Sequence, residues 1–143
     1  MKSIPLIFLL FSVATACNQD DSTNSNQTKV VNTVSSGTWR ITYFYDTDKE
    51  ETTNFTGYNF TFGSSLTATK GGTTYTGTWN VTDSNSNDDT MDDLHFNILF
   101  TAPPDFEDLS DDWKILEMTD TKIKLVDVSG GGGGTDYLTF EKN

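Results

Sequence analysis

The stretch that decides the fold is the ten-residue run Gly37-Thr38-Trp39-Arg40-Ile41-Thr42-Tyr43-Phe44-Tyr45-Asp46. Alternate positions of this run carry large side chains, namely Trp39, Ile41, Tyr43 and Tyr45. Side chains of a β-strand point alternately to its two faces, so this period of two predicts a strand with one buried face. The triplet that opens the run returns as Gly77-Thr78-Trp79 in a second alternating run. We therefore expect two strands that each place a tryptophan in one shared core.

Further short alternating runs follow, separated by turn residues. Gly71-Gly72 is typical of a tight hairpin, because paired glycines supply the positive φ angles that such turns need. No apolar window keeps the 3.6-residue period of a helix. The chain from 37 to 143 therefore predicts an all-β domain of about eight strands, as a meandering barrel or a sandwich. Besides the first run, the expected strands cover residues 58–62, 66–70, 75–81, 94–100, 113–118, 121–128 and 137–141.

Residues 1–16 have the features of a bacterial signal peptide: Lys2, an apolar run, and small residues before Cys17. Ala14-Thr15-Ala16-Cys17 resembles the lipobox, in which the cysteine becomes the lipidated first residue. The alternative is an ordinary signal peptide followed by an incidental cysteine. Cys17 is the only cysteine of the chain, so it could form a disulfide only between molecules, and lipidation accounts better for its presence. Acyl chains such as palmitate on Cys17 would anchor the protein to a membrane that it does not cross.

Residues 17–36 are expected to comprise the lipidated cysteine and a flexible polar tether. The tether is expected to be flexible because it contains few apolar side chains that could be buried. The acidic pair Asp20-Asp21 resembles a surface-export signal of Bacteroidota lipoproteins, and it is equally well interpreted as a solvated patch of linker. We expect a lipid-anchored protein of the outer membrane in the cell envelope. The domain would face either the periplasm or the cell surface. The net charge of −12 argues against a nucleic-acid partner, since acidic surfaces repel phosphates.

The whole pattern resembles the lipocalin-like lipoproteins of Bacteroidota, through Gly37-Thr38-Trp39, Gly77-Thr78-Trp79 and the spacing of the strands. The resemblance covers most of residues 37–143. It implies an antiparallel, up-and-down, eight-stranded barrel, and we expect no major helix in the mature domain. In classical lipocalins an arginine of the last strand packs over the first tryptophan. Here that strand offers only Lys142 for this position.

A barrel of eight strands either fills its lumen with side chains or holds one small ligand. The first functional hypothesis is therefore a small apolar or aromatic ligand inside the barrel, and the filled barrel is the alternative. Aromatic rings would contact such a ligand, and indole N–H and tyrosine hydroxyl groups would orient it. The candidate residues are Trp39, Tyr43, Phe60, Tyr75, Trp79, Phe96 and Trp113.

The second hypothesis is a non-catalytic structural or interaction accessory that contacts another envelope protein. The loop 105–112 places Phe106 and Leu109 among five carboxylates. Apolar residues surrounded by charge can mark a contact surface. The other interpretation, which we favour, is that both side chains fold inward and plug the barrel mouth.

A third hypothesis is a calcium-stabilised surface module, because Asp83, Asn85, Asn87 and Asp89 alternate as oxygen ligands do in the first half of an EF-hand. Asp88 and Leu94 stand where the motif needs glycine and glutamate, so a solvated hairpin loop is the simpler interpretation. We expect no cofactor and no enzymatic activity. His95 is the only histidine, and no pattern of nucleophile and base is recognisable.

Overall fold

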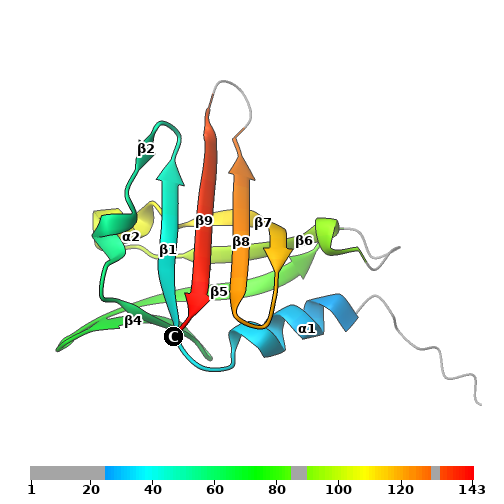
Figure 1. Ribbon diagram of the computed structural model, residues 1–143, viewed down its shortest axis with the longest axis horizontal. Coiled ribbons are helices and arrows are strands. Elements are labelled where there is room, and N and C mark those ends of the chain that lie inside the picture. The colour runs from blue at the N-terminus through cyan, green and yellow to red at the C-terminus, as the bar shows by residue number, and fades with distance from the viewer. Residues whose placement is uncertain (1–24, 85–89, 130–132) are drawn as a thin grey trace, which may run out of the picture.

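The computed structural model describes residues 25–84, 90–129 and 133–143 of the chain. Strands β3 to β9 pair antiparallel in chain order, and β1 pairs with both β3 and β9, which closes an eight-stranded barrel (Figure 1). The short β2 extends β1 outside this closed set. The strands are β1 (Trp39–Asp46), β2 (Lys49–Glu50), β3 (Asn59–Phe62), β4 (Leu66–Lys70), β5 (Thr73–Asp83), β6 (Leu94–Leu99), β7 (Asp111–Met118), β8 (Lys122–Val128) and β9 (Thr135–Lys142).

The predicted all-β, antiparallel, up-and-down barrel is confirmed. Its strands follow the alternation of the sequence, as in β6, where Leu94, Phe96 and Ile98 are buried and the residues between them are not. The inward side chains of all eight strands meet in a single hydrophobic core. The remaining elements are short: α1 (Ser25–Val34), α2 (Pro104–Glu107), and the 3-10 turns η2 (Thr52–Phe55) and η3 (Met91–Asp93).

The prediction that Tyr43 and Tyr45 share the face of Trp39 and Ile41 is wrong. A β-bulge interrupts the pairing of β1 with β9 between Ile41 and Tyr43, because one extra residue stands in β1 there. Since the period of a strand is two, an extra residue exchanges the faces of everything that follows. Phe44 therefore enters the core at 1 % exposure, and Tyr43 lies on the outside at 39 % exposure.

The segment 25–34, predicted as part of the flexible tether, is the helix α1 and packs against β5. Its Val30 and Val34 are fully buried in the core. The spacing of four residues places the two valines on one face of a helix, and the barrel supplies the apolar surface that covers them. Gln27 adds a side-chain hydrogen bond to the carbonyl of Val81 (2.6 Å). α1 thus closes the end of the barrel at which β5 finishes.

None of the helices in the described ranges has the length and apolar character that a membrane crossing requires.

The other end of the barrel is closed by the loop that carries α2. Phe106 is 2 % exposed and Leu109 is fully buried, so the expectation that both fold inward is confirmed. The ring of Phe106 lies 4.9 Å from that of Tyr75 near the start of β5, and 5.2 Å from that of Phe100 after β6 (centroid distances). Phe106 is therefore the plug of this end.

The two Gly-Thr-Trp triplets serve different purposes. Gly37 has a φ of +79°, a conformation that side chains with a Cβ rarely adopt, and it turns the chain from α1 into β1. Gly77 instead lies so close to β6 that an added Cβ would be 2.3 Å from the carbonyl oxygen of Leu99. Trp39 is fully buried as expected, whereas Trp79 is half-buried at the edge of the core.

Candidate functional site

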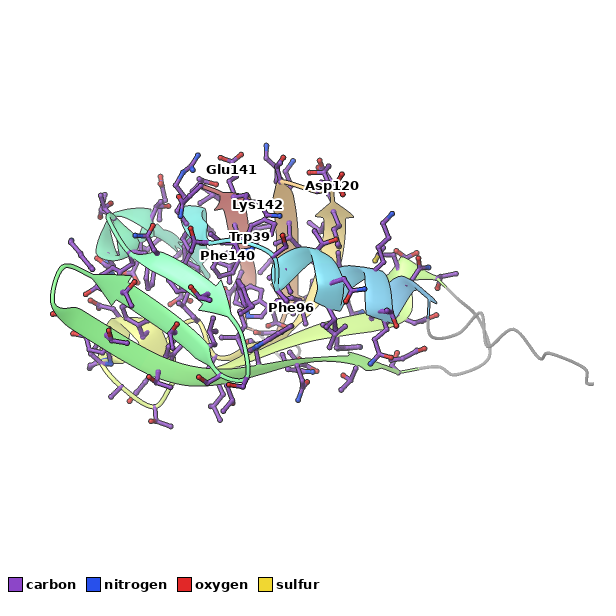
Figure 2. All side chains as sticks on the ribbon, turned by 90° about the horizontal axis from the view of Figure 1, so that it is seen from below. Trp39, Phe96, Asp120, Phe140, Glu141 and Lys142 are labelled. Atoms are coloured by element: carbon purple, nitrogen blue, oxygen red, sulfur yellow. The ribbon has the colours of Figure 1, made fainter. Side chains whose placement is uncertain are left out.

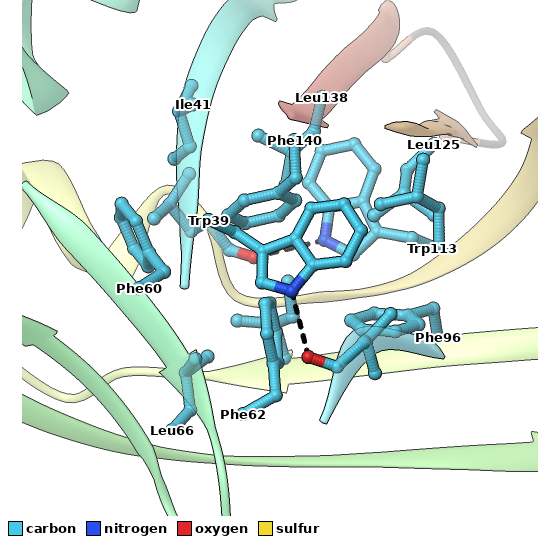
Figure 3. Close-up of a cluster of buried hydrophobic side chains, with 14 of the residues drawn as sticks. Trp39, Ile41, Phe60, Phe62, Leu66, Phe96, Trp113, Leu125, Leu138 and Phe140 are labelled. Atoms are coloured by element: carbon cyan, nitrogen blue, oxygen red, sulfur yellow. Dashed lines mark hydrogen bonds between the residues drawn. The ribbon is translucent and has the colours of Figure 1, made fainter. Parts of the chain in front are cut away.

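The seven aromatic residues predicted to contact a ligand are in three different surroundings. Trp39, Phe60, Phe96 and Trp113 are at most 1 % exposed and form part of the packed core (Figure 3). Tyr75 and Trp79 are half-buried and pack against that core. Tyr43 lies on the outside, as described above. The structure therefore brings six of the seven together, four inside the core and two packed against it.

The indole N–H groups, expected to orient a ligand, are already used within the fold. Trp39 donates to the carbonyl of Val34 (2.8 Å), and Trp113 donates to the carbonyl of Leu109 (3.0 Å). Trp79 donates to the carbonyl of Gly63 (2.9 Å). These bonds join α1 and the plug loop to the barrel wall. A ligand that took one of these donors would leave a backbone carbonyl without its partner, which costs free energy when the carbonyl is buried.

The space between the walls is filled by rings in mutual contact. Phe62 lies 5.5 Å from Phe96 and 5.4 Å from Phe140, both in edge-to-face geometry (centroid distances). Phe60 lies 5.3 Å from Phe140 and 6.1 Å from Phe106. A flat guest between two stacked rings would need a gap of about 7 Å, which is two carbon contact distances. These rings therefore occupy the lumen themselves.

Carboxylates gather in two groups on the described part of the barrel. Oxygen atoms of Asp111, Asp127 and Asp136 lie within 4.8 Å of one another, as do those of the set Asp46, Glu51 and Asp108. Asp127 and Asp136 face each other directly across the pair β8 and β9. Hard cations such as Ca²⁺ take ligands of this type. Without a cation, like charges this close destabilise the folded chain.

We expect the substitution Asp111→Asn to raise Tm by on the order of 2 °C. Burial raises the pKa of the Asp111 carboxyl, and the charge of Asp127 raises that pKa further. Ionised Asp111 therefore lowers the free energy of unfolding at neutral pH. This destabilisation disappears as the pH falls from above the raised pKa of the folded state to below the ordinary pKa of an aspartate. Asparagine keeps an oxygen to accept the backbone N–H of Asp112, which is 2.7 Å from Asp111 Oδ1.

Thermal unfolding at about pH 7 and about pH 3 tests this prediction, because the gain should be present only at the higher pH. Asp120→Asn, in an exposed turn, is the matched control and should leave Tm unchanged. A gain of equal size in both variants would contradict the explanation.

His95 lies half-buried on the outer side of β6, as its position in the alternation predicts. Its Nδ1 is 3.3 Å from a carboxylate oxygen of Asp112. Of the proposed calcium ligands, Asp83 is the last residue of β5, while Asn85, Asn87 and Asp89 lie outside the described residues. Cys17 also lies outside them.

A hollow on the outer side of β1, β9, β8 and β7 was not predicted, and we call it the outer groove. Its volume is about 380 Å³, within the range usual for small-molecule sites. It is open to solvent on the outside of the barrel and separate from the packed lumen. Its walls and rim include Tyr43, Leu116, Lys122, Lys124, Tyr137 and Glu141.

No family model, curated protein or solved structure matches this chain.

Sequence reasoning missed the outer groove because it assigned the aromatic residues of the first strand to the core. Two signals in the sequence could have found it. Tyr43-Phe44-Tyr45 and Ile115-Leu116 put large side chains at consecutive positions, which a strictly alternating strand with one buried face does not do. Consecutive large residues are a signal for a bulge that turns one of them outward.

Proposed function

We propose that this chain is a lipoprotein of the outer membrane, anchored by acyl chains on Cys17, and that its filled barrel is a non-catalytic binding module that acts through its outside. The observation that carries it is the use of all three indole N–H groups within the fold. With its three indole N–H groups bonded internally and its inner rings packed, the domain has its free binding surface outside.

The membrane anchor rests on the N-terminal sequence, where small residues precede the only cysteine. From Cys17 to the first residue of α1, the chain has a short polar connection. α1 then packs on the barrel, so the connection between lipid and domain is shorter than the sequence suggested. This arrangement would hold the barrel near the membrane while leaving its strands accessible.

One contact supports the likeness to lipocalin-like proteins. The Nζ of Lys142 lies 5.0 Å from the centre of the Trp39 ring, and the two residues are cross-strand partners. Lys142 thus takes the place that the resemblance gives to an arginine. In Figure 2, Trp39, Phe140 and Phe96 point into the barrel, and Lys142 lies beside Trp39. A cation over an indole ring contributes about 0.5 to 1 kcal/mol at an exposed site.

Substituting Cys17 by serine should abolish acylation. The test uses Gram-negative cells that are fed with labelled palmitate. We expect the original chain to carry the label and the variant Cys17→Ser to carry none. The protein should also leave the membrane fraction, since acyl chains provide the attachment. Ser22→Ala, a few residues further along, is the matched control and should keep both label and location. An unlabelled original chain would overturn the anchor while leaving the binding module untouched.

A further inference from the structure

The outer side of β7, β8, β9 and β1 presents a regular array of side chains. Cross-strand pairing places Lys114, Val126, Tyr137 and Tyr45 in one row. The next row holds Lys124, Thr139 and Tyr43, and the third holds Lys122, Glu141 and Arg40. Aromatic rings therefore stand beside cationic side chains across four neighbouring strands.

Two β-bulges lie at the same height on either side of this array. In β1 the extra residue is Thr42, and in β7 it is Leu116, which is 59 % exposed. The cross-strand pair of Lys124 and Thr139 lies between them. Bulges re-aim side chains and are common next to functional sites. Together they turn an aliphatic and an aromatic side chain outward at opposite ends of the outer groove.

This face carries more cations than anions, although the chain as a whole has a net charge of −12. Glu141 alone pairs with both Lys122 (2.9 Å) and Arg40 (3.6 Å). Lys124 pairs with Glu117 (2.9 Å). Lys114 makes no ion pair with any residue that the structure describes. The groove itself is lined by two cations, Lys122 and Lys124, and one carboxylate, Glu141, and Lys114 stands on the same face beside it. This excess of cations suits an anionic ligand.

The groove is open to solvent, so its ligand must be amphipathic. An apolar chain would leave most of its surface in water, whereas a pyranose ring has one C–H face and a rim of hydroxyl groups. Tyr43, Tyr137 and Leu116 offer surfaces for the C–H face, since rings favour polarised C–H groups over their negative faces. Glu141 can accept a bond from a hydroxyl, and the two lysines can donate to a carboxylate.

We propose that the outer groove binds a glycan whose sugar rings carry carboxylates. The rings pack on Tyr43, Tyr137 and Leu116, and the carboxylates bind Lys122 and Lys124. This proposal rests on the proposed function in one respect, namely that binding takes place on the outside of the barrel.

The test is an NMR titration of the ¹⁵N-labelled mature chain with tetragalacturonic acid as the probe, and with its methyl ester as the uncharged comparison. We expect amide shifts at the groove strands and a Kd for the ester about tenfold weaker, since the charge-assisted bonds are lost. Leu116→Ala and Lys124→Gln should each weaken acid binding by about five- to tenfold.

Two matched variants lie elsewhere on the barrel. Leu99→Ala removes another leucine that is exposed on a strand (52 %), and Lys49→Gln removes another lysine paired with a glutamate. Both should bind like the original chain. Equal losses in Leu99→Ala and Leu116→Ala would overturn the groove assignment, as would equal binding of acid and ester.

Other outcomes separate this proposal from the proposed function. No shifts at millimolar probe would overturn the acidic glycan and leave the filled barrel intact. Shifts at Trp39 and Phe96 instead of the groove would overturn the filled barrel. An acidic peptide that binds the groove as tightly as the glycan would overturn the choice of sugar.

Discussion

Replacing Phe106 by alanine should lower the free energy of unfolding by about 3 to 5 kcal/mol. The ring is buried in edge-to-face contact with Phe55 (5.3 Å), Tyr58 (5.0 Å) and Phe100 (5.2 Å). The substitution removes apolar area and leaves a cavity at the plugged end. Because the neighbouring rings are themselves packed in or against the core, they can collapse into that cavity only in part.

Urea unfolding followed by tryptophan fluorescence measures this loss. Phe106→Leu is the matched control, since it retains an apolar plug and should lose a smaller part of the stability. If Phe106→Ala stayed within about 0.5 kcal/mol of the original chain, Phe106 would not be the plug.

Gly77→Ala should destabilise the barrel by about 3 kcal/mol or more, beyond ordinary overpacking. The added methyl group would meet the carbonyl oxygen of Leu99 at 2.3 Å and the ring of Phe100 at 2.9 Å. The carbonyl belongs to a paired strand, so it cannot move aside as a flexible side chain could. β5 and β6 would have to separate at this point.

The neighbouring hairpin provides the control for this prediction. An added Cβ at Gly72 would meet nothing within 4 Å, and Gly72 is not among the positive-φ glycines. Gly72→Ala should therefore leave Tm nearly unchanged, or raise it slightly through a less flexible unfolded chain. Equal melting temperatures for Gly72→Ala and Gly77→Ala would show that the strands approach less closely than described.

The strands could be predicted because their side chains alternate, and alternation with turn residues between runs is a local signal. The plug was also predictable, since Phe106 and Leu109 are apolar residues in an acidic loop and gain by burial. The contact of Lys142 with Trp39 came from the family resemblance, because it joins residues at opposite ends of the domain.

The run Tyr43-Phe44-Tyr45 signals a bulge in β1, but it does not say which ring turns inward, since each of the three suits a core. Only the pairing with β9 decides that Phe44 is inside. The helix α1 was missed for a related reason. Two valines do not stabilise an isolated helix, and the surface that buries them is supplied by strands distant in sequence.

The outer groove is the least predictable feature. Its members come from β1, β7, β8 and β9, and the register of three strand pairs brings them together. No local pattern relates Tyr43 to Leu116. The candidate site was therefore placed inside the barrel, where single-strand alternation directed it.

Xenon binding to crystals of the mature chain is the most direct test of a filled barrel with its binding surface outside, because xenon enters dry apolar cavities. We predict no xenon site among the inner side chains of the original chain. In the variant Phe106→Ala we predict one xenon site beside position 106, and this positive control would show that the gas can reach the core. Xenon between Trp39, Phe60 and Phe96 in the original chain would contradict the filled barrel and would make the lumen the candidate ligand site.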